Sequence, residues 1–192
     1  MAADETRAQI LAAARAVLVS DDAFSMEAVA RKADVARMTV YYQFGAKTGL
    51  LEALMDDLAH QGEIDRHLPA AFQQPDALAA LDAFIAAFAH FWASDRVVIR
   101  RLQALAALDP VIAAGNEMRQ GWRRHGARVI VERLAMEGCP PDAPPSDAVD
   151  TLAMLTSFAT YDALATSERT LTDVTSLLQA LARRALGVGV AG

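Results

Sequence analysis

The sequence has few of the residues that cross-link or interrupt a chain. It contains one cysteine, Cys139, so an intrachain disulfide framework is excluded and we expect a cytoplasmic protein. Only 10 glycines and 7 prolines occur in 192 residues, whereas 54% of the residues are hydrophobic. This composition favours a compact, mostly helical protein over a disordered one. We interpret Cys139 as an ordinary loop thiol.

Long apolar runs and an excess of positive charge are also missing. The most apolar stretch, residues 77–93, contains Asp82 and His90 and is shorter than the roughly 20 residues that span a bilayer. We therefore interpret it as a buried helix and expect no membrane partner. The N-terminal MAADETRAQ lacks the basic and apolar blocks of a secretory signal. The net charge of −6 argues against a protein that coats nucleic acid over its whole surface.

The sequence shows none of the common enzyme motifs. It has no glycine-rich phosphate loop, no serine elbow and no paired cysteines. Asp56 and His60 lie four residues apart, but no third ligand is near them in the sequence, so we interpret them as a solvated ion pair. We predict no enzymatic activity, no catalytic residue, no metal site and no cofactor.

Helical periodicity runs from one end of the chain to the other, and no segment has the period of a strand. The sequence predicts an all-α fold of about nine helices, with Pro69 and Pro75 at a boundary. Gly115, Gly121 and Gly126 predict a kink or a close approach of another element in the longest helix. The expected helices are 4–19, one capped by Ser25, 36–44, 47–66, 76–94, 95–108, 110–137, one capped by Ser146 or Asp147 and ending near 166, and one capped by Thr170 or Thr172 and ending near 186.

Residues 25–47 contain the most informative pattern, two short helices joined by a tight turn. Val29, Ala30 and Ala33 suit the buried side of the first helix, and Val40 and Phe44 that of the second. Asp34 lies in the turn, where it tolerates a left-handed backbone.

The second helix of this pair presents Arg37, Met38, Thr39, Tyr42 and Gln43 to solvent, which is the chemistry of a recognition helix in a DNA major groove. Residues 25–47 also carry four cations and two anions, a local excess of +2 in an acidic chain. The excess indicates a small phosphate-facing patch, and the alternative is an ordinary solvated helix face.

These residues resemble the TetR family of bacterial transcriptional regulators. The matching segments are Ile10-Leu11-Ala12-Ala13-Ala14, Val29-Ala30, Thr39-Val40-Tyr41-Tyr42-Gln43-Phe44, and Lys47 followed by Leu50-Leu51. Asp34, Ala36 and Ala46 depart from the family's usual glycine and polar caps. The resemblance implies an N-terminal helix-turn-helix DNA-binding domain (1–47), a connecting helix (47–66), and a helical effector-binding and dimerisation domain (67–192).

The resemblance also implies roles for individual residues. Arg37 and Gln43 would reach base edges, and Lys47 would meet a phosphate. The implied DNA-binding set is Arg37, Met38, Thr39, Tyr41, Tyr42, Gln43 and Lys47.

In the family the C-terminal helices enclose a cavity for an inducing ligand, and here we expect a hydrophobic or aromatic small molecule. His90, Arg101, Asn116, His125 and Thr156 are candidate polar partners. The alternative is a solid core. The candidate lining residues are Phe84, Phe88, Trp92, Met118, Trp122, Met154 and Phe158.

The last two predicted helices suit a four-helix homodimer interface, with small residues among leucines. The alternative is that they close the chain's own core. The candidate interface residues are Leu152, Leu155, Ala159, Val174, Leu177, Leu178 and Leu181.

The sequence therefore predicts a dimeric regulator, a repressor that binds a pseudo-palindromic double-stranded DNA operator and that a small-molecule effector releases. The alternative is a helical adaptor or ligand-binding protein that does not bind DNA.

Overall fold

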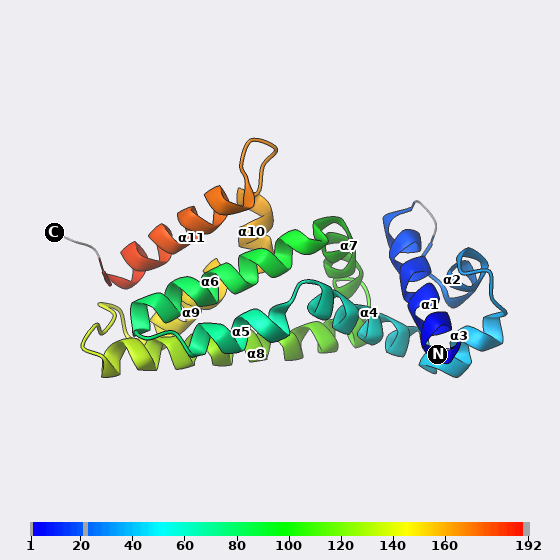
Figure 1. The fold of residues 1–192 in the computed structure, drawn as a ribbon, viewed down its shortest axis with the longest axis horizontal. Coiled ribbons are helices and arrows are strands. Elements are labelled where there is room, and N and C mark those ends of the chain that lie inside the picture. The colour runs from blue at the N-terminus through cyan, green and yellow to red at the C-terminus, as the bar shows by residue number, and fades with distance from the viewer. Residues whose placement is uncertain (1, 21–22, 190–192) are drawn as a thin grey trace. The chain divides into compact units, whose positions relative to one another are not determined.

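The computed structural model describes residues 2–20 and 23–189, and these residues form eleven helices and no strand. The all-α prediction is confirmed. Eleven helices occur where about nine were predicted, because two of the predicted helices are each broken in two. The helices are α1 (Ala2–Val19), α2 (Met26–Lys32), α3 (Arg37–Phe44), α4 (Lys47–Gln61), α5 (Ile64–Phe72), α6 (Ala77–Ser94), α7 (Arg96–Ala106), α8 (Pro110–Met136), α9 (Pro145–Leu155), α10 (Phe158–Leu164) and α11 (Leu171–Leu186), as Figure 1 shows.

The first break separates α4 from α5. Glu63 adopts a left-handed backbone (φ 50°), which ends the helical hydrogen-bonding pattern that was predicted to continue to residue 66. Pro69, predicted to mark a boundary, lies inside α5, so that prediction is wrong. The boundary at Pro75 is confirmed, because it falls between Phe72 and Ala77.

The second break separates α9 from α10. Thr156 ends α9, and the Ser157 hydroxyl accepts a hydrogen bond from the Thr160 N–H (3.2 Å), which starts α10. The predicted caps Ser146 and Asp147 are wrong, because α9 begins after Pro144 without a side-chain cap. Thr170 does cap α11, in a capping box with Asp173.

The chain forms two compact units. The first unit comprises Met1–Gln61 and Asp95–Glu117, and the second comprises Gly62–Ser94 and Met118–Gly192. Helix α8 begins in the first unit and continues in the second. The division into a DNA-binding domain (1–47) and an effector domain (67–192) concerns function and stays a prediction.

The core of the first unit follows the predicted helical stripes. Ile10, Ala14 and Val17 of α1 are buried, as are Leu50 and Leu54 of α4. Helix α1 packs on α2, α4 and α7. Each fully buried leucine or isoleucine side chain contributes about 1.5–3 kcal/mol relative to an exposed one, so this packing is what holds the short helices in place.

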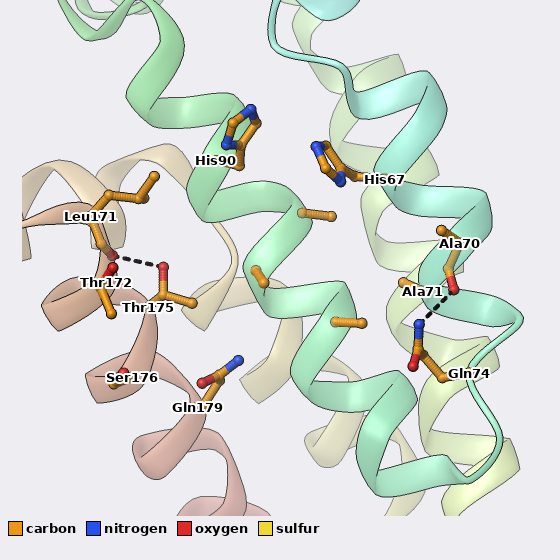
Figure 2. A pocket seen from close by; sticks show the side chains of 13 residues that line it. His67, Ala70, Ala71, Gln74, His90, Leu171, Thr172, Thr175, Ser176 and Gln179 are labelled. Atoms are coloured by element: carbon orange, nitrogen blue, oxygen red, sulfur yellow. Dashed lines mark hydrogen bonds between the residues drawn. The ribbon is translucent and has the colours of Figure 1, made fainter.

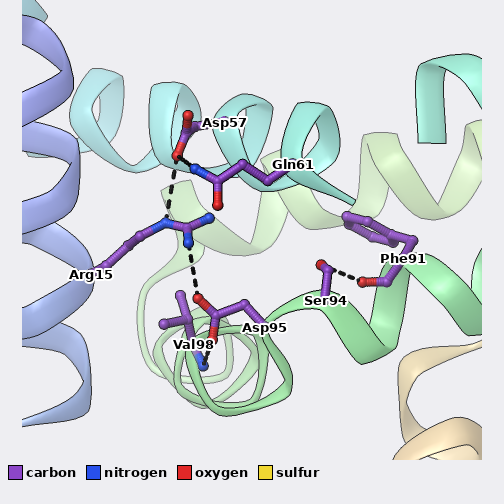
Figure 3. A network of polar contacts seen from close by, with 7 residues as sticks. All are labelled: Arg15, Asp57, Gln61, Phe91, Ser94, Asp95 and Val98. Atoms are coloured by element: carbon purple, nitrogen blue, oxygen red, sulfur yellow. Dashed lines mark hydrogen bonds and ion pairs between the residues drawn. The ribbon is translucent and has the colours of Figure 1, made fainter. Parts of the chain in front are cut away.

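A charged cluster joins three helices of the first unit (Figure 3). Arg15 of α1 donates a hydrogen bond from Nη1 to Asp95 Oδ2 (3.1 Å), and its Nε lies 3.5 Å from Asp57 Oδ2 of α4. Gln61 donates to the same Asp57 oxygen (2.8 Å). Asp95 also caps α7 by accepting from the Val98 N–H (3.3 Å). The Arg15 side chain is only 20% exposed, so this pair is less screened by water than a surface pair.

The core of the second unit is built around α6, which packs against α5, α10 and α11. Among the described residues, α6 is the one helix long and apolar enough to cross a membrane, yet Phe84 and Ile85 at its centre are fully buried. Trp92 donates a hydrogen bond from Nε1 to the Thr156 carbonyl (2.9 Å). Helix α6 is therefore a core helix, as predicted.

The Arg15 cluster leads to a stability prediction. We expect Arg15→Gln to lower the free energy of unfolding by about 1–3 kcal/mol, because two partly buried carboxylates lose their cation. The control is Arg124→Gln, which removes an ion pair with Asp150 whose side chains are 48% and 55% exposed. That change should cost less than about 1 kcal/mol. Urea denaturation followed by circular dichroism measures the free energy of unfolding of both variants. Equal losses would contradict the expectation that the Arg15 cluster stabilises the protein more than an exposed ion pair does.

Candidate nucleic-acid interface and cavity

Helices α2 and α3 form the predicted pair. The Ser25 hydroxyl accepts a hydrogen bond from the Ala28 N–H (3.1 Å) and starts α2. Asp34 adopts the expected left-handed backbone (φ 52°), and the Val35 N–H donates to the Ala30 carbonyl (3.1 Å) to close the turn. Ala36 then begins α3 without a side-chain hydrogen bond, as its sequence indicates.

Helix α3 has a buried side and an open side. Val40 is fully buried and Phe44 nearly so, whereas Met38 is 74% exposed and Tyr42 is 90% exposed. Arg37 is exposed as well, and Thr39, Tyr41 and Gln43 are half-buried at the edges. The described part of the chain leaves this side of α3 uncovered, so it is accessible to a partner.

The Arg37 side chain contacts Tyr41, one turn later in the same helix. Its Nη2 donates to Tyr41 Oη (3.2 Å), and its guanidinium carbon lies 5.4 Å from the centre of the Tyr41 ring. The hydrogen bond with Tyr41 raises the pKa of Arg37 above its usual value. An arginine side chain is charged at physiological pH even without such a shift, so Arg37 is a cation on the exposed side of α3.

Two further cations flank α3. Lys47, the first residue of α4, is half-buried with Nζ 5.9 Å from the centre of the Phe24 ring. Arg7 of α1 donates to the Gln43 carbonyl (3.3 Å) and lies 4.6 Å over the Phe44 ring. Sequence reasoning missed Arg7, which is exposed but lies three residues before buried Ile10 and so borders the packed side of α1. A cation at the last carbonyls of a helix stabilises that end.

The residues predicted to line an effector pocket differ in their exposure, and they stay a prediction. Phe84, Phe88, Trp92 and Phe158 pack on one another, with the Trp92 and Phe158 ring centres 5.5 Å apart. All four are buried in the core of the second unit. The other three predicted lining residues, Met118, Trp122 and Met154, are more than half exposed.

A cavity of about 490 Å³ lies elsewhere in the second unit, between α5, α6 and α11 (Figure 2). Alanines of α5 and α6 form its floor, and polar side chains of α11 form one wall. Of the predicted polar partners, His90 alone lines it. The lining residues are His67, Ala70, Ala71, Gln74, Ala83, Ala86, Ala87, His90, Leu171, Thr172, Thr175, Ser176 and Gln179.

Three donor side chains meet at one end of this cavity. His67 Nε2 lies 3.6 Å and His90 Nε2 lies 3.7 Å from Glu63 Oε2, and the two imidazole rings are 4.8 Å apart. Arg66 donates to the other Glu63 oxygen (2.8 Å), and this interaction lowers the pKa of Glu63. The four-residue spacing of Glu63 and His67 was readable in the sequence, but their meeting with His90 required the packing of α5 on α6.

The predicted dimer-interface residues fall into two groups. Leu152, Leu155, Val174 and Leu178 are buried in the core of the second unit, so they cannot contact another molecule in this structure. The other three, Ala159, Leu177 and Leu181, are half-buried or exposed.

Comparison with known proteins agrees with this geometry. Residues 10–54 match the family model of bacterial regulatory proteins of the tetR family. No curated protein matches the chain. A Rhodococcus RHA1 regulatory protein of the tetR family is similar in structure (TM-score 0.78, 20% identity), over 96% of this chain and 98% of that one.

Two other solved structures resemble this chain over nearly their whole length. Salmonella enterica GusR gives a TM-score of 0.67 at 17% identity, over 95% of this chain and 96% of that one. A TetR/AcrR-family regulator from Thermobifida fusca gives 0.65 at 18% identity, over 97% and 100%. At these identities the structural likeness establishes the fold.

The junction of α3 and α4 leads to a second prediction. A Cβ atom added at Gly49 would overlap the Phe44 carbonyl at the end of α3. We expect Gly49→Ala to destabilise the protein, because a steric cost of about 1–3 kcal/mol exceeds the gain of about 1 kcal/mol in helix propensity. Thermal unfolding followed by circular dichroism measures the change.

The matched control is Gly121→Ala in α8, where an added Cβ meets nothing within 4 Å. This substitution should stabilise the protein by up to about 1 kcal/mol. A higher unfolding midpoint for both variants would show that α4 does not need a glycine at this junction.

Proposed function

We propose that this chain, which belongs to the TetR family of bacterial transcriptional regulators, is a dimeric repressor that a small-molecule effector releases from a pseudo-palindromic operator. We propose that it is a DNA-binding regulator and not an enzyme, which the match of residues 10–54 supports. We propose the cytoplasm as its location. The observation that carries the proposal is the uncovered side of α3, which presents the exposed cation Arg37 and the 90%-exposed Tyr42 to solvent.

We propose that this side of α3 enters the DNA major groove. Arg37 would bond guanine and Gln43 adenine, the bases whose edges match these side chains. Thr39 and Tyr42 would contact a phosphate or a thymine methyl group, and Met38 lies exposed between Arg37 and Thr39. Tyr41 and Lys47 would bond phosphates at the edge of the groove.

Arg37 has to leave Tyr41 to reach a base. In the free chain its guanidinium bonds the Tyr41 hydroxyl, and both groups are at the surface. A hydrogen bond exposed to water in this way adds little stability, because water competes for both groups, so base contacts can replace it. The exchange would leave the Tyr41 hydroxyl available for a phosphate.

We propose that two copies pair through the outer sides of α9, α10 and α11. The support is a set of apolar residues that the chain itself leaves open there: Met154, Ala159 and Leu181 are exposed. A two-fold axis would place two α3 helices on the DNA, so each operator half-site would read as the inverted repeat of the other.

We propose that the effector binds in the cavity between α5, α6 and α11. Its alanine floor suits a largely apolar molecule, and the hydroxyl and amide groups of α11 provide a few polar partners. Release then requires that the effector bind the DNA-incompetent conformation more tightly than the DNA-bound one. The buried aromatic cluster remains as solid packing in this proposal.

The DNA-binding proposal is tested by Tyr42→Ala and Lys47→Ala. Each should weaken operator binding by about 1–3 kcal/mol, roughly 5- to 150-fold, because each removes a groove or phosphate contact. Lys47→Ala should also reduce the salt slope of binding by about one. Fluorescence anisotropy with DNA flanking the gene, or with a selected pool of sequences, measures both.

The control for charge is Arg128→Ala, at an exposed position of α8 in the second unit. It should leave DNA affinity unchanged. If the unchanged protein binds no DNA, or if Tyr42→Ala and Lys47→Ala bind it as tightly as Arg128→Ala does, α3 is not the element that binds DNA. The chain would then fit the adaptor alternative.

The dimer proposal is tested by Leu181→Glu in α11. A charge at this partly exposed position should be tolerated by the monomer but not by a buried interface, so we expect the mass in solution to fall to that of one chain. Sedimentation velocity measures the mass. Met136→Glu in α8, where the native side chain is 78% exposed, is the control and should leave the mass unchanged. A dimer that survives Leu181→Glu would place the interface elsewhere.

A further inference from the structure

We propose that Glu63, His67 and His90 form a binding site for one divalent transition-metal ion, of the class represented by Zn²⁺. Two imidazoles and one carboxylate are a donor set that such ions prefer. The three donor atoms lie within 4.8 Å of one another, and all three residues belong to the second unit. An ion can bind here whether or not the chain acts as a repressor, although His67 and His90 also line the cavity proposed for the effector.

The spacing of the donor atoms suits a shared ion better than direct hydrogen bonds. Glu63 Oε2 lies 3.6 Å from His67 Nε2 and 3.7 Å from His90 Nε2, both longer than the usual N–H···O range of about 2.7–3.2 Å. Ligands bound at about 2.0–2.1 Å in a tetrahedron are about 3.3 Å from each other. Closing the trio around an ion therefore needs movements of a few tenths of an ångström between the carboxylate oxygen and each imidazole nitrogen, and of up to about 1.5 Å for the most distant pair of donors, which lie within 4.8 Å of each other.

The backbone places the three donors with little freedom. Glu63 is held in a left-handed conformation at the start of α5, and His67 follows one turn later on the same side of that helix. His90 comes from α6, which packs along α5, and Figure 2 shows the His67 and His90 side chains pointing toward each other, with their rings arranged edge to face. Apart from Asp34 in the α2–α3 turn, Glu63 is the one non-glycine residue of the described chain with a positive φ. An unfavourable backbone at a donor residue is typical of a functional site.

Arg66 fixes the binding mode of the carboxylate. Its guanidinium bonds Glu63 Oε1 at 2.8 Å, which leaves Oε2 facing the two histidines. Glu63 would thus bind the ion through one oxygen, with Arg66 orienting the carboxylate from the other side. The positive charge of Arg66 also weakens the attraction for a cation, so the affinity depends on both imidazoles.

Three protein donors leave a tetrahedral ion with one open position. His67 and His90 also line the 490 Å³ cavity, so a water molecule can occupy that position from the cavity side. The imidazoles are 36% and 43% exposed, so an ion can enter and leave. This is the pattern of an exchangeable site, and not of a closed structural one with four protein ligands.

The test uses the full-length chain without an affinity tag, freed of metal by a chelator. Calorimetric titration with Zn²⁺ and visible absorption with Co²⁺ should both show one ion per chain, with a tetrahedral Co²⁺ spectrum. His67→Ala and His90→Ala should each weaken binding at least about tenfold, since each removes a direct ligand. Glu63→Gln keeps the size of the side chain and should weaken binding as well.

The matched control is His125→Ala, which removes an exposed histidine of α8. It should bind Zn²⁺ as tightly as the unchanged protein, with the same Co²⁺ spectrum. The proposal is overturned if the unchanged protein takes up no ion, or if His67→Ala and His90→Ala bind as tightly as His125→Ala does.

Thermal unfolding gives a second readout that does not depend on the spectrum. Zn²⁺ should raise the unfolding midpoint of the unchanged protein and of His125→Ala, because the ion binds only the folded trio. It should not raise the midpoint of His67→Ala. An equal rise in His67→Ala would mean that the ion binds elsewhere, and it would overturn the site.

Discussion

An eight-residue helix is not stable alone in water, so the burial of Val40 and Phe44 decides whether α3 exists at all. Helix α3 has no side-chain cap at its start, and its last carbonyls are stabilised by Arg7 from α1. At its end, Gly49 lets α4 approach the Phe44 carbonyl more closely than any other residue would. The uncovered side of α3 is therefore shaped by contacts on its opposite side.

The Arg15 cluster places a similar constraint on the rest of the first unit. One cation in α1 faces a carboxylate in α4 and another at the start of α7. Because the three side chains are mostly removed from water, the two carboxylates favour arrangements in which Arg15 lies between them. Hydrophobic packing determines how close these helices lie. The ion pairs of Arg15 favour the orientation of each helix in which its charged side chain points toward the cluster.

The features that the sequence predicted well are those that short-range chemistry determines. The Ser25 and Thr170 caps, the left-handed Asp34 and the buried stripe of α1 each depend on neighbours within a few residues. The break at Thr156 and the place of Pro69 depend on packing between distant segments, so periodicity missed them. Periodicity also tells which side of α6 is buried, but not whether the facing atoms leave a space. For that reason the cavity beside His67 was missed.

The exposure of Met38 and Tyr42 has an evolutionary consequence. Neither side chain contributes to the core, so substitution at either position changes the free energy of unfolding little. A lineage can therefore exchange these two residues while the packing of α1, α2 and α3 stays intact, and under the proposed role of α3 such an exchange changes the DNA sequence that is bound. By contrast, drift at Val40 or Phe44 would first appear as lower protein abundance and only afterwards as altered gene control.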